Sequence, residues 1–372
     1  MTAAFTVSAE EAGARLTVDL GAIARNYRAL AAMTHGAECA AVVKADAYGT
    51  GIETTAPALA DAGARTFFVA HVSEARRLRA VVPAATIYVL NGLFAEALDI
   101  YARHDLRPVL GSREEIERFG AFCRTTGRRS PAAIHVDTGM NRLGLDMAEA
   151  ALIAEPGPQA LAFEPALLMS HLACADDPGH PLTARQIDRF AQVRALFPGI
   201  AGSLANSAGC TLPATHHDLA RPGIALYGGR YRADREPLEA VVRLEAPLIR
   251  VRDVRAGDTV GYGATWTATR PSRIGIVSVG YADGYIRATS ASDTRTGASV
   301  RVAGRACPLA GRVSMDLLAI DLTDAGAVKP GDPVTLIGDG IGVDDIAQPA
   351  GTIGYEVLTS LGRRYHRRYI QD

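Results

Sequence analysis

The stretch Ala41-Val42-Val43-Lys44-Ala45-Asp46-Ala47-Tyr48-Gly49 runs from apolar residues into a single lysine. The continuous, partly β-branched run from Cys39 to Val43 predicts a short buried strand. A lysine at the end of such a strand would lie at the rim of a parallel sheet or barrel, where active sites are usually built. Desolvation there would lower the pKa of the lysine and make it a candidate Schiff-base nucleophile. The same pattern also fits a lysine that ends a strand and points into water.

Length, composition and charge predict an ordinary globular protein of two domains. The chain has 372 residues, of which 48% are hydrophobic and 21% are charged. Lys and Arg together number 39 and Asp and Glu 40, so the net charge of -1 gives no general attraction to nucleic acid or anionic lipid. The nine histidines are scattered along the chain, and we expect no metal site.

Cysteine spacing and the N-terminal residues indicate in which cellular compartment the protein is expected. The five cysteines are odd in number and include no Cys-x-x-Cys pair, which argues against a disulfide framework or a zinc ribbon. Residues 1–11 lack the basic and then apolar pattern of a signal peptide, and no apolar run reaches about 18 residues. We therefore expect a cytoplasmic protein with no membrane span.

From about residue 14 to residue 227, short apolar runs alternate with longer segments of helical character. The candidate strands are Ala40–Val43, Phe67–Ala70, Thr86–Leu90, Pro108–Leu110, Ala132–Val136, Ala166–Met169, Gly202–Ala205 and Gly223–Leu226. Eight strand-and-helix units in about 200 residues predict an α/β fold with a (β/α)8 TIM-like barrel over residues 1–235. An open doubly wound sheet would give the same alternation, but the strand count favours the barrel.

Two segments between these strands carry helix signals. Ser112 and Glu115 have the spacing of a capping box. In the segment from Ala184 to Leu196, apolar residues recur in steps of three along one side. They are Ile187, Phe190, Val193 and Leu196.

After Tyr227-Gly228-Gly229 the helical periodicity largely disappears. The expected strands are Arg243–Val254, Arg273–Gly280, Ala298–Ala303, Leu317–Leu322 and Val334–Ile337. Turn signals such as Lys329-Pro330-Gly331-Asp332 separate them. This pattern predicts a small C-terminal all-β domain over residues 236–372.

Polar residues follow several of the barrel strands, at the edge where barrel enzymes assemble their sites. They are Lys44, Arg142, His171, Asn206 and Ser207. Arg221 instead precedes the strand expected at Gly223–Leu226, which does not place it at that edge. A single strand-end residue of this kind is more often structural than catalytic, whereas the set together predicts one site.

In combination these stretches resemble the alanine racemases, a family of fold-type III pyridoxal-phosphate enzymes with an α/β barrel and a C-terminal β domain. The resemblance extends from Val18-Asp19-Leu20 to Tyr355-Glu356-Val357. Its motifs are Val-Val-Lys-Ala-Asp-Ala-Tyr-Gly at 42–49, Asp-Thr-Gly-Met at 137–140, Asn-Ser at 206–207, Arg-Pro-Gly at 221–223, Gly-Tyr-Gly-Ala-Thr at 261–265, Gly-Tyr-Ala-Asp-Gly-Tyr at 280–285 and Gly-Arg-Val-Ser-Met-Asp at 311–316. It implies an isomerase that interconverts L-alanine and D-alanine and supplies D-alanine as a peptidoglycan precursor.

The resemblance implies that Lys44 binds pyridoxal 5'-phosphate covalently and then serves as a catalytic base. The cofactor-binding residues that it implies are Lys44, Tyr48, Arg142, His171, Asn206, Ser207, Arg221, Gly223, Ile224 and Tyr355. Arginine keeps its proton, so Arg221 at the ring nitrogen would leave that nitrogen unprotonated and the ring a weaker electron sink.

Racemisation needs a base on each face of the substrate, and the family assigns the second to Tyr262. A phenol of pKa ~10 must be lowered to act near neutral pH. The implied substrate-binding residues are Arg142, Met315 and Tyr281. The resemblance also implies that Tyr262, Tyr281 and Met315 come from the partner subunit of a homodimer with shared active sites.

Simpler interpretations exist for the residues of the second domain. Tyr262 could be a packed turn residue, Met315 could belong to the core, and Arg312 could pair structurally with Asp316. For the whole chain, an amino-acid decarboxylase of similar architecture is disfavoured, because its glycine-rich phosphate loop and second-domain cysteine motif are not found. A racemase for another small amino acid such as serine, or a non-catalytic pyridoxal-phosphate carrier protein, remains as an alternative.

One position departs from the family pattern. Many racemases of this type have a carbamylated lysine two residues before the aspartate of Asp-Thr-Gly-Met, and this chain has His135 there. Strand alternation predicts that His135 points into the barrel, toward Arg142. We expect that a neutral His135 accepts a hydrogen bond from Arg142, or that an anion such as chloride binds between them.

Overall fold

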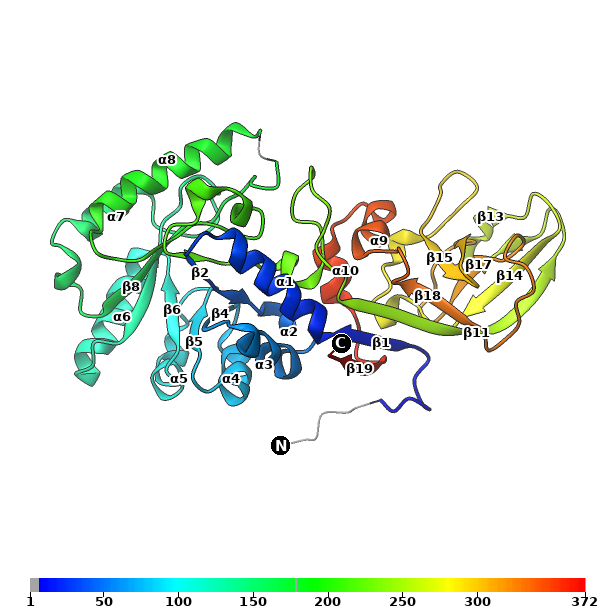
Figure 1. Cartoon of the computed structure of the whole chain (residues 1–372), viewed down its shortest axis with the longest axis horizontal. Coiled ribbons are helices and arrows are strands. Elements are labelled where there is room, and N and C mark those ends of the chain that lie inside the picture. Colours follow the sequence, from blue (N-terminus) through cyan, green and yellow to red (C-terminus); the bar gives the residue numbers. More distant parts are fainter. Residues whose placement is uncertain (1–6, 178, 372) are drawn as a thin grey trace. The chain divides into compact units, whose positions relative to one another are not determined.

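The structure is a computed structural model that describes residues 7–177 and 179–371. The chain forms two compact units (Figure 1): Ile23–Glu239 make up the first, and residues 7–22 with 240–371 make up the second. The predicted division between residues 235 and 236 lies near the later of these boundaries. The sequence pattern does not predict that residues up to 22 join the second unit. They do so because β1 (Arg15–Asp19) pairs with β11 (Val242–Val254) and β19 (His366–Ile370).

The first unit is built around a parallel sheet of seven strands that follow one another in chain order. They are β3 (Ala41–Val42), β4 (Thr66–Val69), β5 (Thr86–Val89), β6 (Arg107–Leu110), β7 (Pro131–His135), β8 (Glu164–Met169) and β9 (Gly202–Ser203). An eighth strand, β10 (Leu219–Ala220), pairs in parallel with β2 (Glu38–Cys39), which leads into β3. The amide of Val42 also donates to the carbonyl of Pro222 at 3.1 Å. These bonds close the sheet and confirm the predicted TIM-like barrel.

The strand predicted at Gly223–Leu226 is wrong. Residues Ile224–Tyr227 form a turn of 3₁₀ helix, in which the amide of Leu226 donates to the carbonyl of Gly223 at 2.9 Å. The last barrel strand is β10 instead, and it is only two residues long. Arg221 therefore follows its strand directly and lies at the same edge of the barrel as the other strand-end residues.

Helices alternate with the barrel strands along the chain (Figure 1). They are α1 (Leu20–Met33), α3 (Ile52–Ala62), α4 (Val72–Val81), α5 (Leu98–Arg103), α6 (Arg113–Thr126), α7 (Met147–Ala154) and α8 (Pro181–Leu196). Ser112 caps α6 as predicted, and its hydroxyl accepts the amide of Glu115 at 3.2 Å. In α8, Phe190 and Val193 are buried but Leu196 is exposed, so the apolar stripe is shorter than predicted.

The barrel strands are buried on both faces, because helices cover the outside and side chains fill the inside. All four residues of β4 are buried. Around the sheet, Phe119 and Phe163 meet edge to face with their ring centroids 5.6 Å apart. Burial of each such aromatic side chain contributes about 1.5–3 kcal/mol. This packing gives the polar residues at the strand ends a rigid support.

The second unit is a β domain, as predicted, and is organised around the long strand β11. This strand pairs with β1, with β14 (Ser272–Val277) and with β18 (Pro333–Ile337). The remaining strands are β12 (Thr259–Val260), β13 (Trp266–Thr267), β15 (Ser299–Val302), β16 (Arg305–Pro308) and β17 (Leu318–Asp321). The five predicted runs correspond to β11, β14, β15, β17 and β18. The unit also holds two short helices that the pattern does not predict, α9 (Val343–Ala350) and α10 (Gly354–Ser360).

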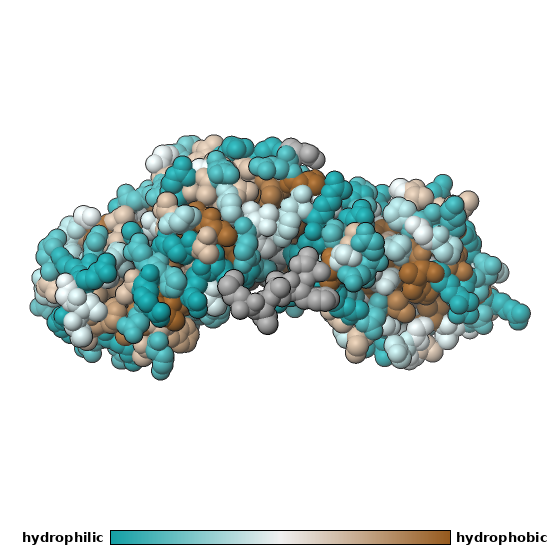
Figure 2. Space-filling view, turned by 90° about the horizontal axis from the view of Figure 1, so that it is seen from below, coloured by the Kyte–Doolittle hydropathy of each residue, from teal (hydrophilic) through white to brown (hydrophobic). Residues whose placement is uncertain are grey.

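Hydrophilic residues cover most of the face drawn in Figure 2, and apolar residues reach the surface in smaller groups. No helix of the described residues is long and apolar enough to cross a membrane. Each of the five cysteines is a free thiol.

The packing of α1 on the first part of the barrel sheet can be tested at Tyr27. This side chain is buried, and its hydroxyl donates to the carbonyl of Cys39 at 2.8 Å. Tyr27→Phe leaves that carbonyl without this donor and should lower the free energy of unfolding by about 1–2 kcal/mol. Urea denaturation measures the change. Phe94→Leu, at a side chain that is 52% exposed, serves as the control and should leave the midpoint unchanged. Equal midpoints for the two variants would contradict a stabilising hydrogen bond from Tyr27 to the Cys39 carbonyl.

Candidate active site

Lys44 lies at the carboxyl end of the first barrel strand, as predicted. It follows β3 after a single residue, Val43, and is half-buried. Burial lowers the pKa of Lys44, the charge of Arg142 lowers it further, and Glu74 acts in the opposite direction. A lysine in this setting carries a larger fraction of neutral amine than one in water, which is what a nucleophile or base requires.

The backbone after Lys44 turns in the left-handed sense. Ala45, Asp46, Ala47 and Tyr48 all have positive φ, between 53° and 57°. Amide-to-carbonyl bonds from Ala47 to Val43 at 3.0 Å and from Gly49 to Ala45 at 2.9 Å close this turn. Left-handed geometry costs roughly 1–2 kcal/mol per non-glycine residue, so it persists only where the surroundings enforce it. The turn is therefore a strained segment directly attached to Lys44.

Tyr48, Ser207 and Gly223 meet on one side of the barrel opening. The Ser207 hydroxyl accepts the amides of Gly223 at 2.8 Å and Ala225 at 3.3 Å. A Cβ at residue 223 would lie 2.3 Å from the Tyr48 hydroxyl, so only glycine allows this approach. The Tyr48 ring stacks on Tyr227 with centroids 4.5 Å apart. Hydroxyl and backbone N–H groups that converge in this way suit an anion.

Asn206 supports the neighbouring loop. Its side-chain carbonyl accepts the amide of Gly209 at 3.0 Å, and its amide donates to the carbonyl of Leu172 at 3.4 Å. These bonds link the chain after β9 to the chain after β8. They hold Ser207, the next residue, in place.

Arg221 is a buried guanidinium that is held by two hydrogen bonds. It donates to the Ser203 hydroxyl and, at 2.6 Å, to the carbonyl of Ser170. The guanidinium carbon also lies 5.8 Å from the centroid of the Phe68 ring. Burial lowers the pKa of Arg221 to about 10, so the group is still protonated at neutral pH.

Two histidines share this cationic environment. Burial, followed by the nearby charge of Arg221, holds the pKa of His171 well below its ordinary value. The same causes, in the same order, lower the pKa of His135 to about 4. Both imidazoles are therefore neutral at pH 7. The fixed positive charges at this edge belong to Arg142 and Arg221, whereas Lys44 has a lowered pKa.

Arg142 is exposed, and among residues 7–177 and 179–371 its side chain makes no hydrogen bond or ion pair. The preceding turn is held by Asp137, whose carboxylate accepts the amides of Gly139 at 2.7 Å and Met140 at 2.8 Å. The direct hydrogen bond expected between Arg142 and His135 is thus not formed. The neutral imidazole expected at residue 135 agrees with its lowered pKa.

The predicted residues of the second unit lie in exposed loops. Tyr262 begins the 3₁₀ turn Tyr262–Ala264 and is 72% exposed, so it is not a packed turn residue. Met315 is 54% exposed and does not belong to the core. Tyr281 lies beside it, because its amide donates to the carbonyl of Ser314 at 3.0 Å. A Cβ at Gly280 would lie 2.2 Å from the Met315 carbonyl oxygen, so this approach also needs glycine.

The structural pair considered between Arg312 and Asp316 is not formed. The Asp316 carboxylate instead binds Arg364 at 2.8 Å, and Arg364 also binds Asp283 at 3.1 Å. Tyr355 lies on α10, where its carbonyl accepts the Thr359 hydroxyl at 2.8 Å. A role of Tyr355 toward a phosphate group stays a prediction.

The number of lysines singles out Lys44 independently of the sequence motifs. The chain contains two lysines, Lys44 and Lys329, against 37 arginines. Lys329 lies exposed in the turn before β18, with its amide bonded to Asp332. A chemistry that needs a desolvated lysine can therefore use only Lys44. No group of three or more His, Cys, Asp or Glu residues able to hold a metal ion occurs among the described residues.

Comparison with known families decides the class of this site. The model of the alanine racemase N-terminal domain matches residues 18–231, and that of the alanine racemase C-terminal domain matches residues 241–369. The chain belongs to the alanine racemase family. The alanine racemase of Methylobacterium nodulans is 56% identical over 364 residues, which cover 96% of each chain. That of Rhizobium meliloti is 47% identical over 369 residues, covering 96% of this chain and 97% of the relative.

Solved structures of the alanine racemase family show the same architecture. The enzyme from Bartonella henselae, with covalently bound pyridoxal phosphate, has a TM-score of 0.91 and 40% identity, covering 96% of this chain and all of its own. The biosynthetic alanine racemase of Pseudomonas aeruginosa has a TM-score of 0.89 and 41% identity, with 96% and 99% coverage.

The state of His135 gives a test of how Arg142 is held. Because this residue is not a lysine and is neutral above about pH 4, racemase activity should not depend on bicarbonate. As the pH falls toward 4, His135 gains a proton and repels Arg142, so activity should fall. We expect His135→Gln to flatten this acid limb. Assays in bicarbonate-depleted buffer, with and without halide, show whether an anion bound between His135 and Arg142 supports activity. Stimulation by bicarbonate would contradict the expectation.

Proposed function

We infer that this chain interconverts L-alanine and D-alanine with pyridoxal 5'-phosphate as its cofactor. The observation that carries the inference is Lys44, a desolvated lysine at a barrel strand end, within a chain whose full-length relatives are alanine racemases. The same reaction serves synthesis and breakdown of D-alanine, and relatives named biosynthetic and catabolic both match along the chain. We propose supply of D-alanine as a cytoplasmic peptidoglycan precursor as its use.

The residues at the barrel opening fit this cofactor. Lys44, Arg142 and Arg221 supply positive charge, and the N–H groups near Gly223 with the Ser207 hydroxyl supply donors for a phosphate. Tyr48, Ile224 and Tyr355 would complete the phosphate site, and Asn206 and His171 would lie along the ring. When bound, pyridoxal phosphate supplies an aldehyde for the lysine amine and a conjugated ring that delocalises the charge left by a departing Cα proton.

Two side chains would move the protons. The neutral amine of Lys44 takes the Cα proton from one face of the substrate, and the Tyr262 hydroxyl gives a proton to the other face. In the reverse direction the roles exchange. Arg221 remains protonated at neutral pH and would donate to the ring nitrogen, which would leave that nitrogen without a proton of its own and the ring a weaker electron sink.

The substrate carboxylate would be bound by Arg142, which has no other ion pair among the described residues, and by the N–H of Met315. Tyr281 would limit the size of the amino acid that enters. Tyr262, Tyr281 and Met315 are large, exposed side chains of the second unit. We propose that they reach the site of the partner subunit in a homodimer, which would bury them. Serine would be accepted more weakly than alanine, and a non-catalytic carrier would not need these residues.

Replacement of Lys44 tests the inference directly. Lys44→Ala should abolish the yellow colour of bound cofactor and lower racemisation by at least about 10³-fold, because one base is lost. Borohydride treatment of the native protein should attach the cofactor to the Lys44 peptide. Lys329→Ala is the matched control and should keep both colour and activity. Cofactor fixed at Lys329 would overturn the assignment.

A hybrid dimer tests whether sites are shared. Lys44→Ala and Tyr262→Phe should each be inactive alone. After subunit exchange, about half of the dimers are hybrids with one native site, so about a quarter of native activity should return. Mass spectrometry of the intact dimers verifies exchange. Proven exchange without recovery would place both bases on one chain.

A further inference from the structure

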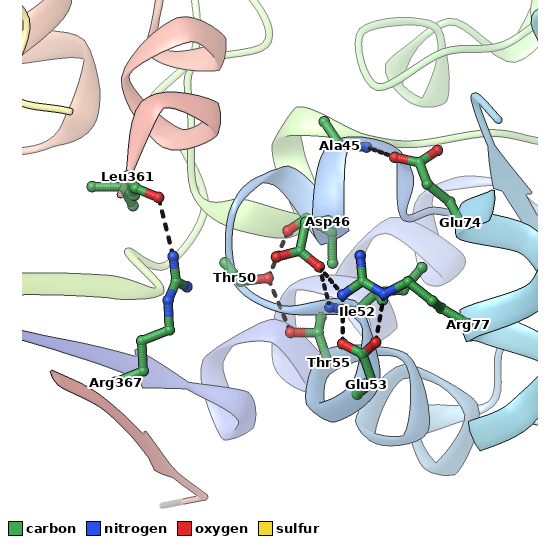
Figure 3. Close-up of polar contacts among 11 residues, drawn as sticks. Ala45, Asp46, Thr50, Ile52, Glu53, Thr55, Glu74, Arg77, Leu361 and Arg367 are labelled. Atoms are coloured by element: carbon green, nitrogen blue, oxygen red, sulfur yellow. Dashed lines mark hydrogen bonds and ion pairs between the residues drawn. The ribbon is translucent and has the colours of Figure 1, made fainter. Parts of the chain in front are cut away.

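Helix α4 contacts the left-handed turn that follows Lys44 (Figure 3). Glu74 and Arg77 lie one turn apart near the start of this helix, and both point toward the turn. Neither residue belongs to the motifs that identify the family in this chain. Their contacts with the turn are direct and are confined to its first two residues.

Glu74 joins three backbone amides. Its carboxylate accepts the amide of Ala45 at 2.6 Å, that of Ala70 at 2.8 Å and that of His71 at 3.1 Å. The last two belong to the loop that begins α4, so the carboxylate ties this loop to the residue after Lys44. Bonds from a charged acceptor to N–H groups are roughly twice as strong as neutral ones.

Arg77 holds the next residue of the turn. It donates to the Asp46 carboxylate at 2.5 Å and forms two bonds to Glu53 on α3, at 2.5 Å and 2.6 Å (Figure 3). Asp46 also accepts the amide of Ile52 at 3.2 Å. The turn is thus anchored to both α3 and α4.

The anchor at Ala45 is placed where the backbone changes hand. Lys44 precedes the left-handed residues, and Ala45 is the first of them. Because left-handed geometry is unfavourable for alanine, a partner that orients the Ala45 amide helps to decide where the change occurs. A shift of the change by one residue would redirect the Lys44 side chain.

Glu74 also sets the balance of charge at Lys44. Arg142 lowers the pKa of Lys44, opposite to the effect of Glu74. The nearby His171 is neutral because its pKa is low. Glu74 is the acidic group that raises the pKa of Lys44. Geometry and charge thus act on the same lysine through one carboxylate.

We propose that Glu74 is a positioning residue for Lys44, which fixes the turn at Ala45 and offsets the charge of Arg142 at the lysine amine. This deepens the proposed function and rests on Lys44 being its reactive lysine. Glu74 does not touch the substrate and acts only through the lysine.

The chain offers a matched control in Glu115. This residue occupies the same place on α6, where its carboxylate accepts the amide of Gly111 at 2.7 Å. It also accepts the amide of Leu93, in the loop after β5, at 2.8 Å. It ties a helix start to the loop before it, as Glu74 does, but contacts no part of the lysine turn. A purely structural role would give the same consequences at the two positions.

The test uses the reactivity of the two lysines in the full chain freed of cofactor. Acetylation by acetic anhydride is followed at Lys44 and Lys329 by peptide mass spectrometry between pH 6 and pH 10. In Glu74→Gln, Lys44 should react about threefold faster or more near pH 7, since loss of the carboxylate charge favours the neutral amine. Lys329 should be unchanged. Glu74→Asp, which restores the charge, should return toward native rates, and Glu115→Gln should leave both lysines as in the native protein.

Equal Lys44 reactivity in Glu74→Gln and Glu115→Gln would overturn the proposal. Hydrogen exchange of the unaltered protein gives a second measurement that does not depend on a variant that folds. The Ala45 amide, although its residue is exposed, should be protected by the Glu74 carboxylate. Exchange as fast as in a free peptide would also overturn it. Failure of the proposed function would appear separately, as borohydride-fixed cofactor on Lys329.

Discussion

The structure depends on the concentration of positive charge at the carboxyl edge of one barrel. Burial is the main cause of the low pKa values of His135 and His171, and the charges of Arg221 and Arg142 lower both further. Lys44 adds to this effect at His171. Such a cluster is unfavourable unless an anion joins it or a group gives up its proton. Both outcomes serve the inferred reaction, because the substrate carboxylate would supply the anion at Arg142 and Lys44 is the group that would lose its proton.

The rest of the first unit holds this charge in place. Arg221 is buried against Phe68 and bonded to Ser203, the last residue of β9, and to Ser170, which follows β8, so its position is fixed by the barrel itself. Closure of the sheet between β10 and β2 brings Gly223 against Tyr48 and next to the strand that carries Lys44. The left-handed turn is held by this rigid barrel, and it fixes the orientation of the Lys44 side chain. Such rigidity is useful because a small displacement of a reacting group lowers the rate strongly.

Most of the barrel follows from the sequence, because continuous apolar runs mark strands buried on both faces. The pattern fails at β10, since two residues cannot show a period, and the apolar residues 224–226 belong to a 3₁₀ turn instead. The sequence pattern also does not predict that β1 joins the second unit, because β1 pairs with β11, which lies more than 200 residues later in the chain. Family motifs predict roles for Lys44, Tyr262 and Met315. The exposure of Tyr262 and Met315 shows that neither is a packed turn or core residue. Glu74 is not predicted, because its contact with Ala45 arises only when α4 and the left-handed turn come together.

A preformed left-handed turn, anchored by α4, would direct Lys44 toward the cofactor. A crystal structure of the protein after borohydride reduction with pyridoxal phosphate tests this most directly. We expect the cofactor attached to Lys44, positive φ from Ala45 to Tyr48, and a hydrogen bond from the Ala45 amide to the Glu74 carboxylate. A right-handed turn at these residues, or a Glu74 that points away from Ala45, would contradict it.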